Sequence, residues 1–316
     1  MKRIVVACGG TSPEREVSLN SGEAVANGLI EAGYDVILED VTSPRTFVEK
    51  WDKFAAEGTF IALHGGWGED GRFQTCLDSY GIPYTGSGPE ACMVGMDKNL
   101  AKLLFAQNNV PAPEGFIHTK DGECKGQGLE LIKKYGSIIV KPNGGGSTVG
   151  VTMHIKTKDE LLAGLELAWK EESRALVEAY IPGKEATVPV WEKENGEVIA
   201  LPVIEIRPKT GFYDYKNKYT HGNTEYICPA TFSENTTKKM QEAAVNAYKC
   251  LGCRAYSRTD FRVTDDNEIF ALEVNTAPGM TSTSLVPKAA KAAGISFPDF
   301  LDSIVKLSFS IDRKYK

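Results

Sequence analysis

The chain lacks a long hydrophobic run: none of its apolar stretches approaches the roughly 20 residues that a membrane-spanning helix needs. The apolar stretch Ile4–Ala7 is too short for the core of a signal peptide and is typical of a buried strand. The chain also lacks an excess of basic residues, because its formal net charge is −6. We therefore expect neither a membrane nor a nucleic acid as a main partner.

Paired cysteines and clustered histidines are missing as well. The seven cysteines are an odd number scattered along the chain, which is typical of reduced thiols in a cytoplasmic protein. Cys250 and Cys253 form a lone C-x-x-C motif at the end of a helical pattern, which favours packing over redox or zinc chemistry. The four histidines lie far apart and show no metal-ligand spacing.

What is present is the composition of an ordinary globular protein. Hydrophobic residues make up 42% and charged residues 25% of a chain of 316 residues, which is long enough for two or three domains. Residues 1–96 alternate strand and helix patterns, which predicts an α/β domain with a parallel sheet. Residues 97–182 predict a small α+β domain, and residues 183–316 predict a strand-rich and then helical domain.

Local signals place several elements within these domains. Three strands are expected in the first domain, at residues 4–7, 34–39 and 59–63. The segment Asn20–Glu23 resembles a capping box at the start of a helix. Leucines at helical spacing predict a helix over Lys98–Asn108. Asn195–Gly196 predicts a hairpin turn, and Ser233 predicts the start of a further helix.

A hairpin near the C-terminus places acids on facing strands. Residues 258–263 and 269–275 are strand-like and flank Asp266–Asn267, which suits the positive φ angles of a two-residue turn. In that register one face pairs Asp260 with Glu273 and Arg258 with Asn275, and the apolar face pairs Phe261 with Leu272 and Val263 with Phe270.

The facing acids require an explanation, because like charges directly opposite each other destabilise a sheet. At ~5 Å and an effective dielectric constant near 20, two carboxylates repel by about 3 kcal/mol. A divalent cation between Asp260 and Glu273 would remove this repulsion, and Mg²⁺ takes such oxygen ligands alongside substrate phosphates. The alternative is a solvated sheet surface on which the acids splay apart and Arg258 neutralises one of them.

A glycine-rich turn follows a strand in the middle of the chain. It runs from Lys141 to Gly150 with the sequence KPNGGGSTVG. Glycines let backbone N–H groups approach phosphate oxygens closely, and Lys141 adds a positive charge, so we expect a phosphate site. The spacing matches neither the phosphate-loop nor the dinucleotide fingerprint, which leaves an ordinary turn as the alternative.

Two loops of the first domain follow strand ends. The loop over residues 8–18 carries Glu14, which would repel a phosphate and suits a substrate ammonium group; a solvated loop is the alternative. The segment His64–Gly71 also follows a strand, and ligands of open α/β sheets bind outside such carboxyl ends. A structural histidine is the alternative for His64.

Two segments of the C-terminal domain add further candidates. Residues 275–285 leave the acidic strand and enter a helix that Ser284 could cap, and the first N–H groups of that helix suit a carboxylate. The N–H of Gly279 could stabilise a developing oxyanion. Residues 213–219 are aromatic and basic and predict an ordered loop or lid, in which Lys218 could reach a phosphate and Tyr219 could close over a substrate.

Taken in order, these segments resemble the D-alanine–D-alanine ligases, a family of ATP-grasp enzymes. The resemblance covers essentially the whole chain and rests on GGTSPEREVSLNSG, LHGGWGEDGRFQ, YTGSG, MDK, VKPNGGGSTVG, FYDYKNKY, SRTDF and EVNTAPGMTSTSLVP. Each segment alone is modestly specific, whereas the ordered set is highly specific. The resemblance implies a three-domain ATP-grasp architecture with ATP between the central and C-terminal domains.

The resemblance also implies a nucleotide and metal site. Phosphate contacts would come from Lys98, Lys141, Gly146, Ser147 and Lys218, adenine contacts from Glu178, Ala179, Tyr180 and Ile181, and a ribose contact from Glu185. Asp260, Glu273 and Asn275 would hold two Mg²⁺ ions, with Glu273 bridging them. Mn²⁺ could replace Mg²⁺, and a monovalent cation such as K⁺ is a further candidate cofactor.

The same resemblance implies how the first substrate is activated. The first D-alanine would hold its ammonium group near Glu14 and lie beside His64. Its carboxylate would attack the γ-phosphorus of ATP and give an acyl phosphate and ADP. Ser147, Tyr219 and Glu14 would link by hydrogen bonds and close the lid loop against water, which an acyl phosphate requires.

The second substrate would complete the reaction. Its carboxylate would be held by Ser284 and Leu285, and its amine would attack the acyl phosphate. Arg258 and the N–H of Gly279 would stabilise the tetrahedral oxyanion. The chain offers no convincing Ser-His-Asp or Cys-His set, and this chemistry needs no protein nucleophile.

These expectations describe a cytoplasmic enzyme that makes a peptidoglycan precursor and, by family resemblance, forms a homodimer. Two alternatives remain open. A D-alanine–D-lactate or D-alanine–D-serine ligase is the nearest enzyme rival. A non-catalytic nucleotide-binding relative is the other, and the presence of Arg258, Asp260, Glu273 and Asn275 argues against it.

Overall fold

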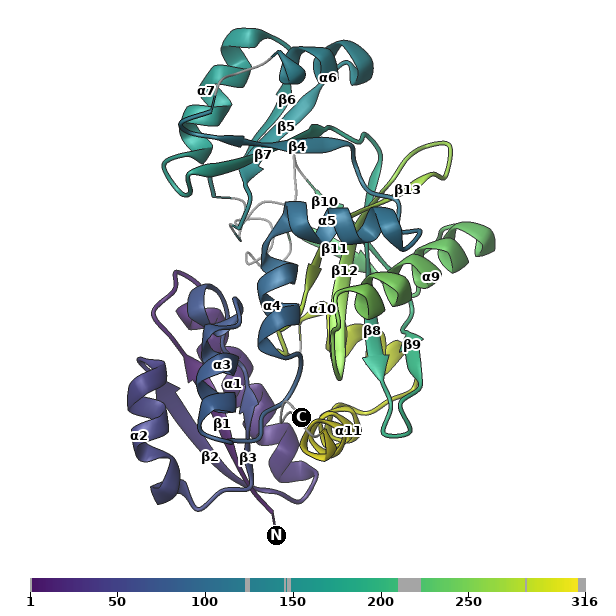
Figure 1. Ribbon diagram of the computed structural model, residues 1–316. Coiled ribbons are helices and arrows are strands. Elements are labelled where there is room, and N and C mark those ends of the chain that lie inside the picture. The colour runs from purple at the N-terminus through teal and green to yellow at the C-terminus, as the bar shows by residue number, and fades with distance from the viewer. Residues whose placement is uncertain are drawn as a thin grey trace.

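The computed structural model describes residues 2–122, 126–144, 146, 149–209, 223–281 and 283–311. The described residues form three β-sheets that follow one another along the long axis of the molecule (Figure 1). A three-stranded N-terminal sheet lies at one end, a four-stranded sheet lies at the other, and a six-stranded sheet lies between them. In this part of the chain, none of the helices has the length and apolar character needed to cross a bilayer.

The N-terminal sheet is parallel, which confirms the prediction from its alternating pattern. Strands β1 (Arg3–Gly9), β2 (Asp35–Val41) and β3 (Gly58–Ile61) lie in the order β2-β1-β3. Helix α1 (Arg15–Glu31) covers one face, where Leu29 packs with Val6. Helices α2 (Pro44–Phe54) and α3 (Arg72–Ser79) cover the other face, where Phe47 packs with Val5.

The start of α1 differs from the prediction. Glu14 occupies the N-cap position, so the proposed capping box at Asn20–Glu23 lies inside the helix, and that prediction is wrong. The helix begins earlier because Ser12 forms the preceding turn: its Oγ accepts from the Glu14 N–H at 3.1 Å and donates to the His64 carbonyl at 2.6 Å. Ser21 is buried in the helix, where its hydroxyl contacts His64 instead of capping.

The four-stranded sheet is antiparallel. Its strands are β4 (Gly115–Thr119), β5 (Ile138–Pro142), β6 (Thr152–Ile155) and β7 (Arg174–Ala179), in the order β4-β7-β5-β6. Helices α6 (Gln127–Tyr135) and α7 (Lys158–Ala168) cover one face, where Leu165 packs with Val140. Because side chains alternate along a strand, Ile139 and Lys141 line the opposite face, toward the six-stranded sheet.

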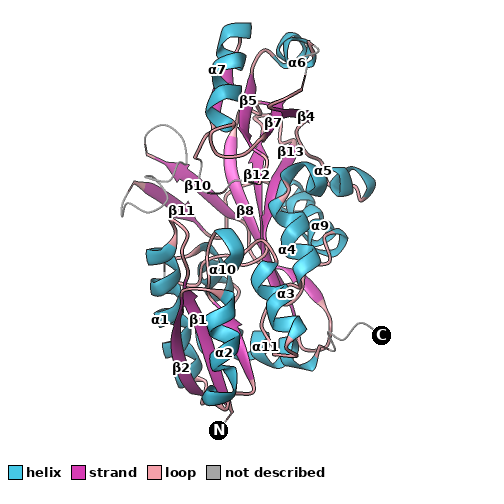
Figure 2. Ribbon diagram, turned by 60° about the vertical axis from the view of Figure 1, so that its left-hand side comes forward, coloured by secondary structure: helices cyan, strands magenta, loops and turns pink. Residues whose placement is uncertain are grey.

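The six-stranded sheet forms the centre of the molecule (Figure 2). Its strands are β8 (Lys184–Glu192), β9 (Val198–Ala200), β10 (Ile204–Pro208), β11 (Thr224–Ile227), β12 (Tyr256–Val263) and β13 (Ile269–Asn275). Their order is β11-β10-β8-β12-β13, and β9 pairs with β8. Helix α9 (Glu234–Cys250) and helix α5 (Lys98–Gln107) share one core with this sheet.

Several local predictions are confirmed around this sheet. Ser233 is the N-cap of α9 and accepts a hydrogen bond from the N–H of Thr236 at 3.2 Å. Gly196 has a φ angle of 82° in the turn that joins β8 to β9. Cys250 and Cys253 form no disulfide: Cys250 is the last residue of α9 and packs against the core, and Cys253 is buried within it.

The end of the chain returns to the N-terminal sheet. After α10 (Leu285–Ala292), helix α11 (Phe297–Ser310) places Leu301 in one core with Leu29 of α1. Phe105 of α5 packs in the core beneath α9. Helix α4 (Pro89–Met96) precedes α5 and contacts β13. Helices α5 and α11 thus share cores with elements beyond the expected boundaries after residues 96 and 182. The boundaries themselves stay a prediction.

The acidic hairpin has the predicted register at its open end. Arg258 lies opposite Asn275, and Asp260 lies opposite Glu273, so both pairings are confirmed. Nearer the turn the prediction is wrong: Phe261 lies opposite Ala271 rather than Leu272, and Val263 lies opposite Ile269 rather than Phe270.

The turn explains this difference. The backbones of Thr264 and Glu268 are hydrogen-bonded at 2.9 Å, and Asn267 takes a φ angle of 64° at the end of a three-residue loop, in place of the expected two-residue turn. The odd residue is absorbed by a β-bulge that follows Asp260, and this bulge restores the predicted register beyond it. As a result, Leu272 lines the same cleft as Glu273 instead of facing the apolar side.

Candidate active site

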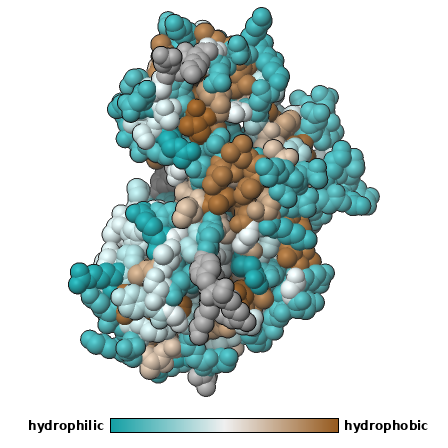
Figure 3. All heavy atoms as spheres, viewed as in Figure 1, coloured by the Kyte–Doolittle hydropathy of each residue, from teal (hydrophilic) through white to brown (hydrophobic). Residues whose placement is uncertain are grey.

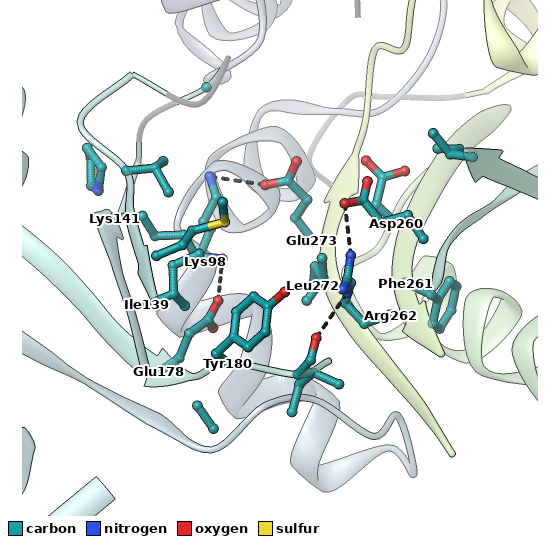
Figure 4. Close-up of a pocket in the computed structure, with 18 of the residues that line it drawn as sticks. Lys98, Ile139, Lys141, Glu178, Tyr180, Asp260, Phe261, Arg262, Leu272 and Glu273 are labelled. Carbon is teal, nitrogen blue, oxygen red and sulfur yellow. Dashed lines mark hydrogen bonds and ion pairs between the residues drawn. The ribbon is translucent and has the colours of Figure 1, made fainter. Parts of the chain in front are cut away.

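A cleft between the four-stranded and six-stranded sheets gathers most of the predicted nucleotide residues (Figure 4). It holds about 1020 Å³ of empty space that opens to solvent. The predicted residues that line it are Lys98, Lys141, Gly146, Glu178, Ala179, Tyr180, Ile181, Glu185, Asp260 and Glu273. Apolar walls are added by Ile139, Val149, Val151, Met153, Ile206, Phe261 and Leu272. Apolar walls with a few convergent charged groups suit a flat ring that carries an anionic tail.

One wall of the cleft contains a buried carboxylate, Glu178, that has two lysine partners, of which Lys141 lines the cleft and Lys102 does not. Glu178 has 2% of its side chain exposed, and its Oε1 lies 2.5 Å from Nζ of Lys141. Its Oε2 pairs with Nζ of Lys102. Burial raises the pKa of Glu178, but the charges of Lys102 and Lys141 outweigh this effect and hold the pKa below its ordinary value. Burial lowers the pKa of Lys102 to about 8, against the opposing effect of Glu178.

The segment that follows Glu178 is held by an arginine from the neighbouring sheet. Arg262 Nε donates to the carbonyl of Ile181 at 3.1 Å, and its Nη2 donates to the carbonyl of Gly183 at 2.8 Å. Its Nη1 pairs with Oε1 of Glu185 at 2.9 Å. Its guanidinium carbon lies 5.9 Å from the ring centroid of Tyr180. Arg262 therefore fixes the strand connection on which the adenine and ribose contacts are predicted.

The stem of the glycine-rich turn is tied to the start of α5. The carbonyl of Asn143 accepts from the N–H of Lys98 at 3.2 Å, and its Oδ1 accepts from the N–H of Asn99 at 2.9 Å. The N–H of Gly144 donates to Oε2 of Glu172 at 2.6 Å. Lys98 and the glycine-rich turn, both predicted to contact phosphates, are thus positioned by one another.

Each of the facing acids on β12 and β13 has a cationic partner. Arg258 makes two hydrogen bonds to Asp260, from Nε to Oδ1 at 2.8 Å and from Nη2 to Oδ2 at 2.9 Å. Asn275 Nδ2 also donates to Oδ2 of Asp260, at 3.2 Å. Nζ of Lys98 lies 3.3 Å from Oε2 of Glu273 across the cleft (Figure 4). The proposed neutralisation of one acid by Arg258 is confirmed.

The residue types around these acids fit a magnesium site that phosphate oxygens complete. The carboxylates of Asp260 and Glu273 line one edge of the cleft and offer hard oxygen donors. Asn275 is not among the lining residues, but it lies two residues beyond Glu273 on β13, contacts Asp260, and adds an amide oxygen. Within the described ranges, no group of three or more His, Cys, Asp and Glu side chains could hold a metal by itself. Mg²⁺ is commonly held by one or two carboxylates together with substrate phosphates, so a protein-only cage is not required.

A second group of predicted residues converges where the N-terminal domain meets the end of β13. His64 is buried, and its Nε2 lies 2.9 Å from Oγ of Ser21. A Cβ built on Gly279 would lie 4.0 Å from His64 Nε2 and 3.0 Å from Oγ of Ser284. A Cβ built on Gly65 would lie 2.8 Å from Oε2 of Glu14, the residue predicted to hold an ammonium group.

The start of α10 differs from the simple cap that was expected. Ser284 occupies the N-cap position, but its side chain caps no helical N–H. Its Oγ instead accepts from the N–H of Thr281 at 3.1 Å, which closes the preceding turn. The side chain of Leu285 is buried in the core, so only its backbone can face a ligand.

Comparisons with known proteins agree with this geometry. The family model described as "D-ala D-ala ligase C-terminus" matches residues 118–306. The chain is 43% identical to a D-alanine–D-alanine ligase of Desulforamulus reducens, over 97% of this chain and 98% of that protein. The chain belongs to the D-alanine–D-alanine ligase family.

Solved structures of this family have the same ATP-grasp fold. The D-alanine–D-alanine ligase of Bacillus anthracis superposes with a TM-score of 0.85 at 35% identity, covering 98% of this chain and 97% of that one. The structure of that ligase complexed with ATP gives a TM-score of 0.84 at 32% identity, with the same coverage. The D-Ala:D-Ser ligase VanG of Enterococcus faecalis gives 0.81 at 30% identity, covering 97% of this chain and 99% of that one.

Three predicted site residues are not described by the structure, and three residues of the site were not predicted. Ser147, Lys218 and Tyr219 lie outside the described residues. Sequence reasoning missed Lys102, Arg262 and Ser21. Lys102 stands four residues after Lys98 on one helix, and Arg262 continues the two-residue spacing of Arg258 and Asp260, so periodicity carried a signal for both. Ser21 was assigned to a cap.

Proposed function

We propose that this protein joins two D-alanines to D-alanyl-D-alanine, with conversion of ATP to ADP, and so supplies a peptidoglycan precursor. The observation that carries the proposal is the meeting of buried lysines and two facing acids in one cleft. Lysines alone would suit many anions, and acids alone would suit many cations. Together they suit a metal-bound triphosphate.

The nucleotide would lie with its base against the apolar walls and the segment that Arg262 fixes. Backbone groups of Glu178–Ile181 would contact the adenine, and Glu185 would contact the ribose. Lys98 and Lys141 would contact the phosphates beneath the glycine-rich turn, which includes Gly146 and Ser147. Lys218 would approach the γ-phosphate. The tie between the glycine-rich turn and α5 supports a common phosphate site, because it positions both elements before the ligand arrives.

Two Mg²⁺ ions would be held by Asp260, Glu273 and Asn275, with Glu273 shared between them. Bound there, they would neutralise charge on the phosphates and favour in-line transfer. Mn²⁺ could substitute, because it takes the same oxygen ligands. K⁺ stays a candidate cofactor. For Lys98, binding would replace the Glu273 carboxylate by a phosphate oxygen, so the lysine changes partner without losing one.

The first D-alanine would bind near Glu14 and His64, with its carboxylate toward the γ-phosphorus. Attack by a carboxylate oxygen breaks the bond between the β,γ-bridging oxygen and phosphorus, and ADP leaves with that bond's electron pair. The product is an acyl phosphate, which water would hydrolyse. Ser147, Tyr219 and Glu14 would link to shut the site during this step.

The second D-alanine would bind with its carboxylate at Ser284 and the backbone of Leu285. Its neutral amine attacks the acyl carbon, and the bond from that carbon to the phosphate oxygen breaks. Phosphate leaves with the electron pair of that bond, and the nitrogen gives up one proton to solvent or to the departing phosphate as the peptide bond forms. Arg258 and the N–H of Gly279 would stabilise the oxyanion. The 3.0 Å approach that a Cβ at Gly279 would make to Ser284 Oγ supports a common site for these two groups, because it brings the backbone of Gly279 close to the predicted carboxylate contact. Arg258 is already fixed by its paired hydrogen bonds to Asp260, so it needs little reorganisation.

The experiment that tests this function measures ADP release and product mass. We expect ADP release that depends on D-alanine, and a product with the mass of D-alanyl-D-alanine. D-Lactate or D-serine, added in competition across a range of pH, should enter the product poorly. Preferred incorporation of either would establish the rival ligase. ADP release that is indifferent to every D-amino acid would refute the proposal.

A homodimer is proposed for the assembled enzyme. Met93 of α4 and Leu100 and Leu103 of α5 have 59%, 40% and 56% of their surface exposed. Figure 3 shows apolar side chains gathered at the middle of this face. An exposed apolar group of this kind supports a protein–protein contact. We also propose a cytoplasmic location, as expected from the cysteine usage.

A further inference from the structure

A buried cluster of three charges lies partly behind the cleft wall. Glu178 stands at its centre, with Lys141 on one carboxylate oxygen and Lys102 on the other. The exposed fractions of these side chains are 2%, 11% and 10%. Lys141 lines the cleft, whereas Lys102 does not, so only one of the two lysines can meet a ligand there.

The cluster contains two lysines for one carboxylate, which is one more cation than the carboxylate needs. A carboxylate buried in a low-dielectric interior needs a cation nearby, and one lysine satisfies that need. A second buried lysine adds a desolvation penalty and leaves the cluster with a surplus positive charge. That penalty is visible in the pKa of Lys102, which burial lowers. Lys102 is needed as a second cation if Lys141 leaves Glu178 to bind a ligand in the cleft.

We propose that Lys102 is a positioning residue for nucleotide binding: it keeps Glu178 neutralised and in place while Lys141 turns from Glu178 to the nucleotide phosphates. The proposal rests on the proposed function, in which Lys141 contacts ATP. Lys102 would act without touching the nucleotide. Through Glu178 it would also hold the first residue of the segment predicted to contact adenine.

The positions of the two lysines support these separate roles, in which Lys141 binds phosphates and Lys102 retains Glu178. Lys102 sits one helical turn after Lys98 on α5, while Lys141 comes from β5 and Glu178 from β7. The cluster therefore joins a helix that packs on the six-stranded sheet to two strands of the four-stranded sheet. When Lys141 moves toward phosphates, Lys102 keeps this connection, so the cleft walls keep their spacing.

Steady-state kinetics of three variants test the proposal. For Lys102→Met we expect the KM for ATP to rise about tenfold or more, because Glu178 then holds Lys141 back, while the KM for D-alanine stays within about twofold. Lys102→Arg keeps the charge and should stay within about threefold of the parent KM for ATP. The double variant Lys102→Met/Glu178→Gln removes the carboxylate that retains Lys141, so it should recover most of the loss.

Controls separate this inference from the proposed function. Lys133→Met, on the exposed side of α6, removes a lysine near the same sheet and should leave all constants unchanged. If Lys141→Met leaves the KM for ATP unchanged, the proposed nucleotide site is wrong. If Lys141→Met raises that KM but Lys102→Met does not, only the role of Lys102 is refuted.

Two further outcomes decide against a positioning role. An equal rise in the KM values for ATP and D-alanine in Lys102→Met would indicate general loosening of the fold. A double variant as impaired as the single one would show that lost packing, not the stranded carboxylate, causes the defect. If Lys102→Met fails to fold, the affinities of Lys102→Arg and of the double variant for ADP, measured by calorimetric titration, test the proposal instead. Near-parent affinity in both supports the proposal, and weak binding by Lys102→Arg opposes it.

Discussion

Gly279→Ala tests whether the second substrate needs the backbone of Gly279 and the hydroxyl of Ser284 in their present positions. The added Cβ would lie 3.0 Å from Ser284 Oγ and 4.0 Å from His64 Nε2. The φ angle of Gly279 lies outside the left-handed region, so alanine brings no backbone strain there. Because Gly→Ala at a compatible position tends to stabilise by roughly 0.4–1 kcal/mol, any fold penalty should come only from the contact with Ser284 and stay small.

The variant should lose more in kcat/KM than in stability of the fold. The hydroxyl of Ser284 must move by a few tenths of an ångström to accept the methyl group, and it is held by the N–H of Thr281 at 3.1 Å. Because a misplacement of about 1 Å can reduce rate by about 10²-fold, a shift of a few tenths of an ångström should lower kcat/KM for D-alanine by roughly three- to tenfold. The KM for ATP should change little, since the nucleotide cleft lies elsewhere.

The assay for this variant is ADP release at varied D-alanine, with thermal unfolding measured in parallel. Gly164→Ala is a matched control, because its Cβ would also approach a side-chain atom to 3.0 Å, at Cδ1 of Ile155 in the core beneath α7. That control should keep full activity. If Gly279→Ala retains kcat/KM within about twofold of the parent, the substrate does not occupy this corner and the argument fails.

Three further predictions concern the nucleotide cleft. Glu273→Gln should lower turnover by about 10²-fold or more, because it removes the carboxylate proposed to be shared by two metal ions. The change in Tm should be small, because the amide oxygen can still accept a hydrogen bond from Lys98. Near-normal ADP release would contradict the metal role. Arg262→Lys loses the planar fork that binds two carbonyls and Glu185, so the KM for ATP should rise about tenfold with the KM for D-alanine unchanged, and equal rises would point to unfolding. The pKa of Glu178 is held below 4.5 by its lysines, so its pairing stabilises the fold above pH 4.5 and is lost as pH falls through the lower folded value. In Glu178→Gln, the free energy of unfolding measured with urea should therefore fall less steeply than in the parent as the pH is lowered from about 5 to about 3. The same pH dependence in both proteins would refute this pairing.

The parts of this fold that sequence could predict are those governed by local periodicity. The parallel N-terminal sheet followed from strands that alternate with helices, since only a crossover connection joins parallel neighbours. The pairing of Asp260 with Glu273 followed from the two-residue repeat of side chains along a strand. The turn between them was mistaken because Asp266–Asn267 satisfies a two-residue turn locally. The bulge at Leu272 is visible only once both strands are paired.

The parts that escaped prediction depend on tertiary contacts. Helix α5 was expected from its leucines, yet Leu100 and Leu103 are exposed, whereas Lys98 is buried. A charged residue becomes buried in this way only when another element supplies its counter-ion, here Glu273 of β13. No local pattern contains that information. Periodicity could place Lys102 beside Lys98 on one face of α5, but it could not predict the pairing with Glu178, which lies 76 residues further along the chain.

The candidate site is built from carboxylates and cations that already hold one another. The pairs are Lys98–Glu273, Arg258–Asp260, Arg262–Glu185 and the two lysines on Glu178. Four carboxylates face five cations, so the cleft is close to neutral before any ligand binds. A metal-bound triphosphate is also close to neutral, because its metal ions balance its phosphates. Binding would then exchange partners: Lys98 and Lys141 pass to phosphates, Glu273 passes to a metal, and Lys102 stays on Glu178. Such an exchange avoids stranding a buried charge, which explains how facing acids and paired lysines can coexist in one stable fold.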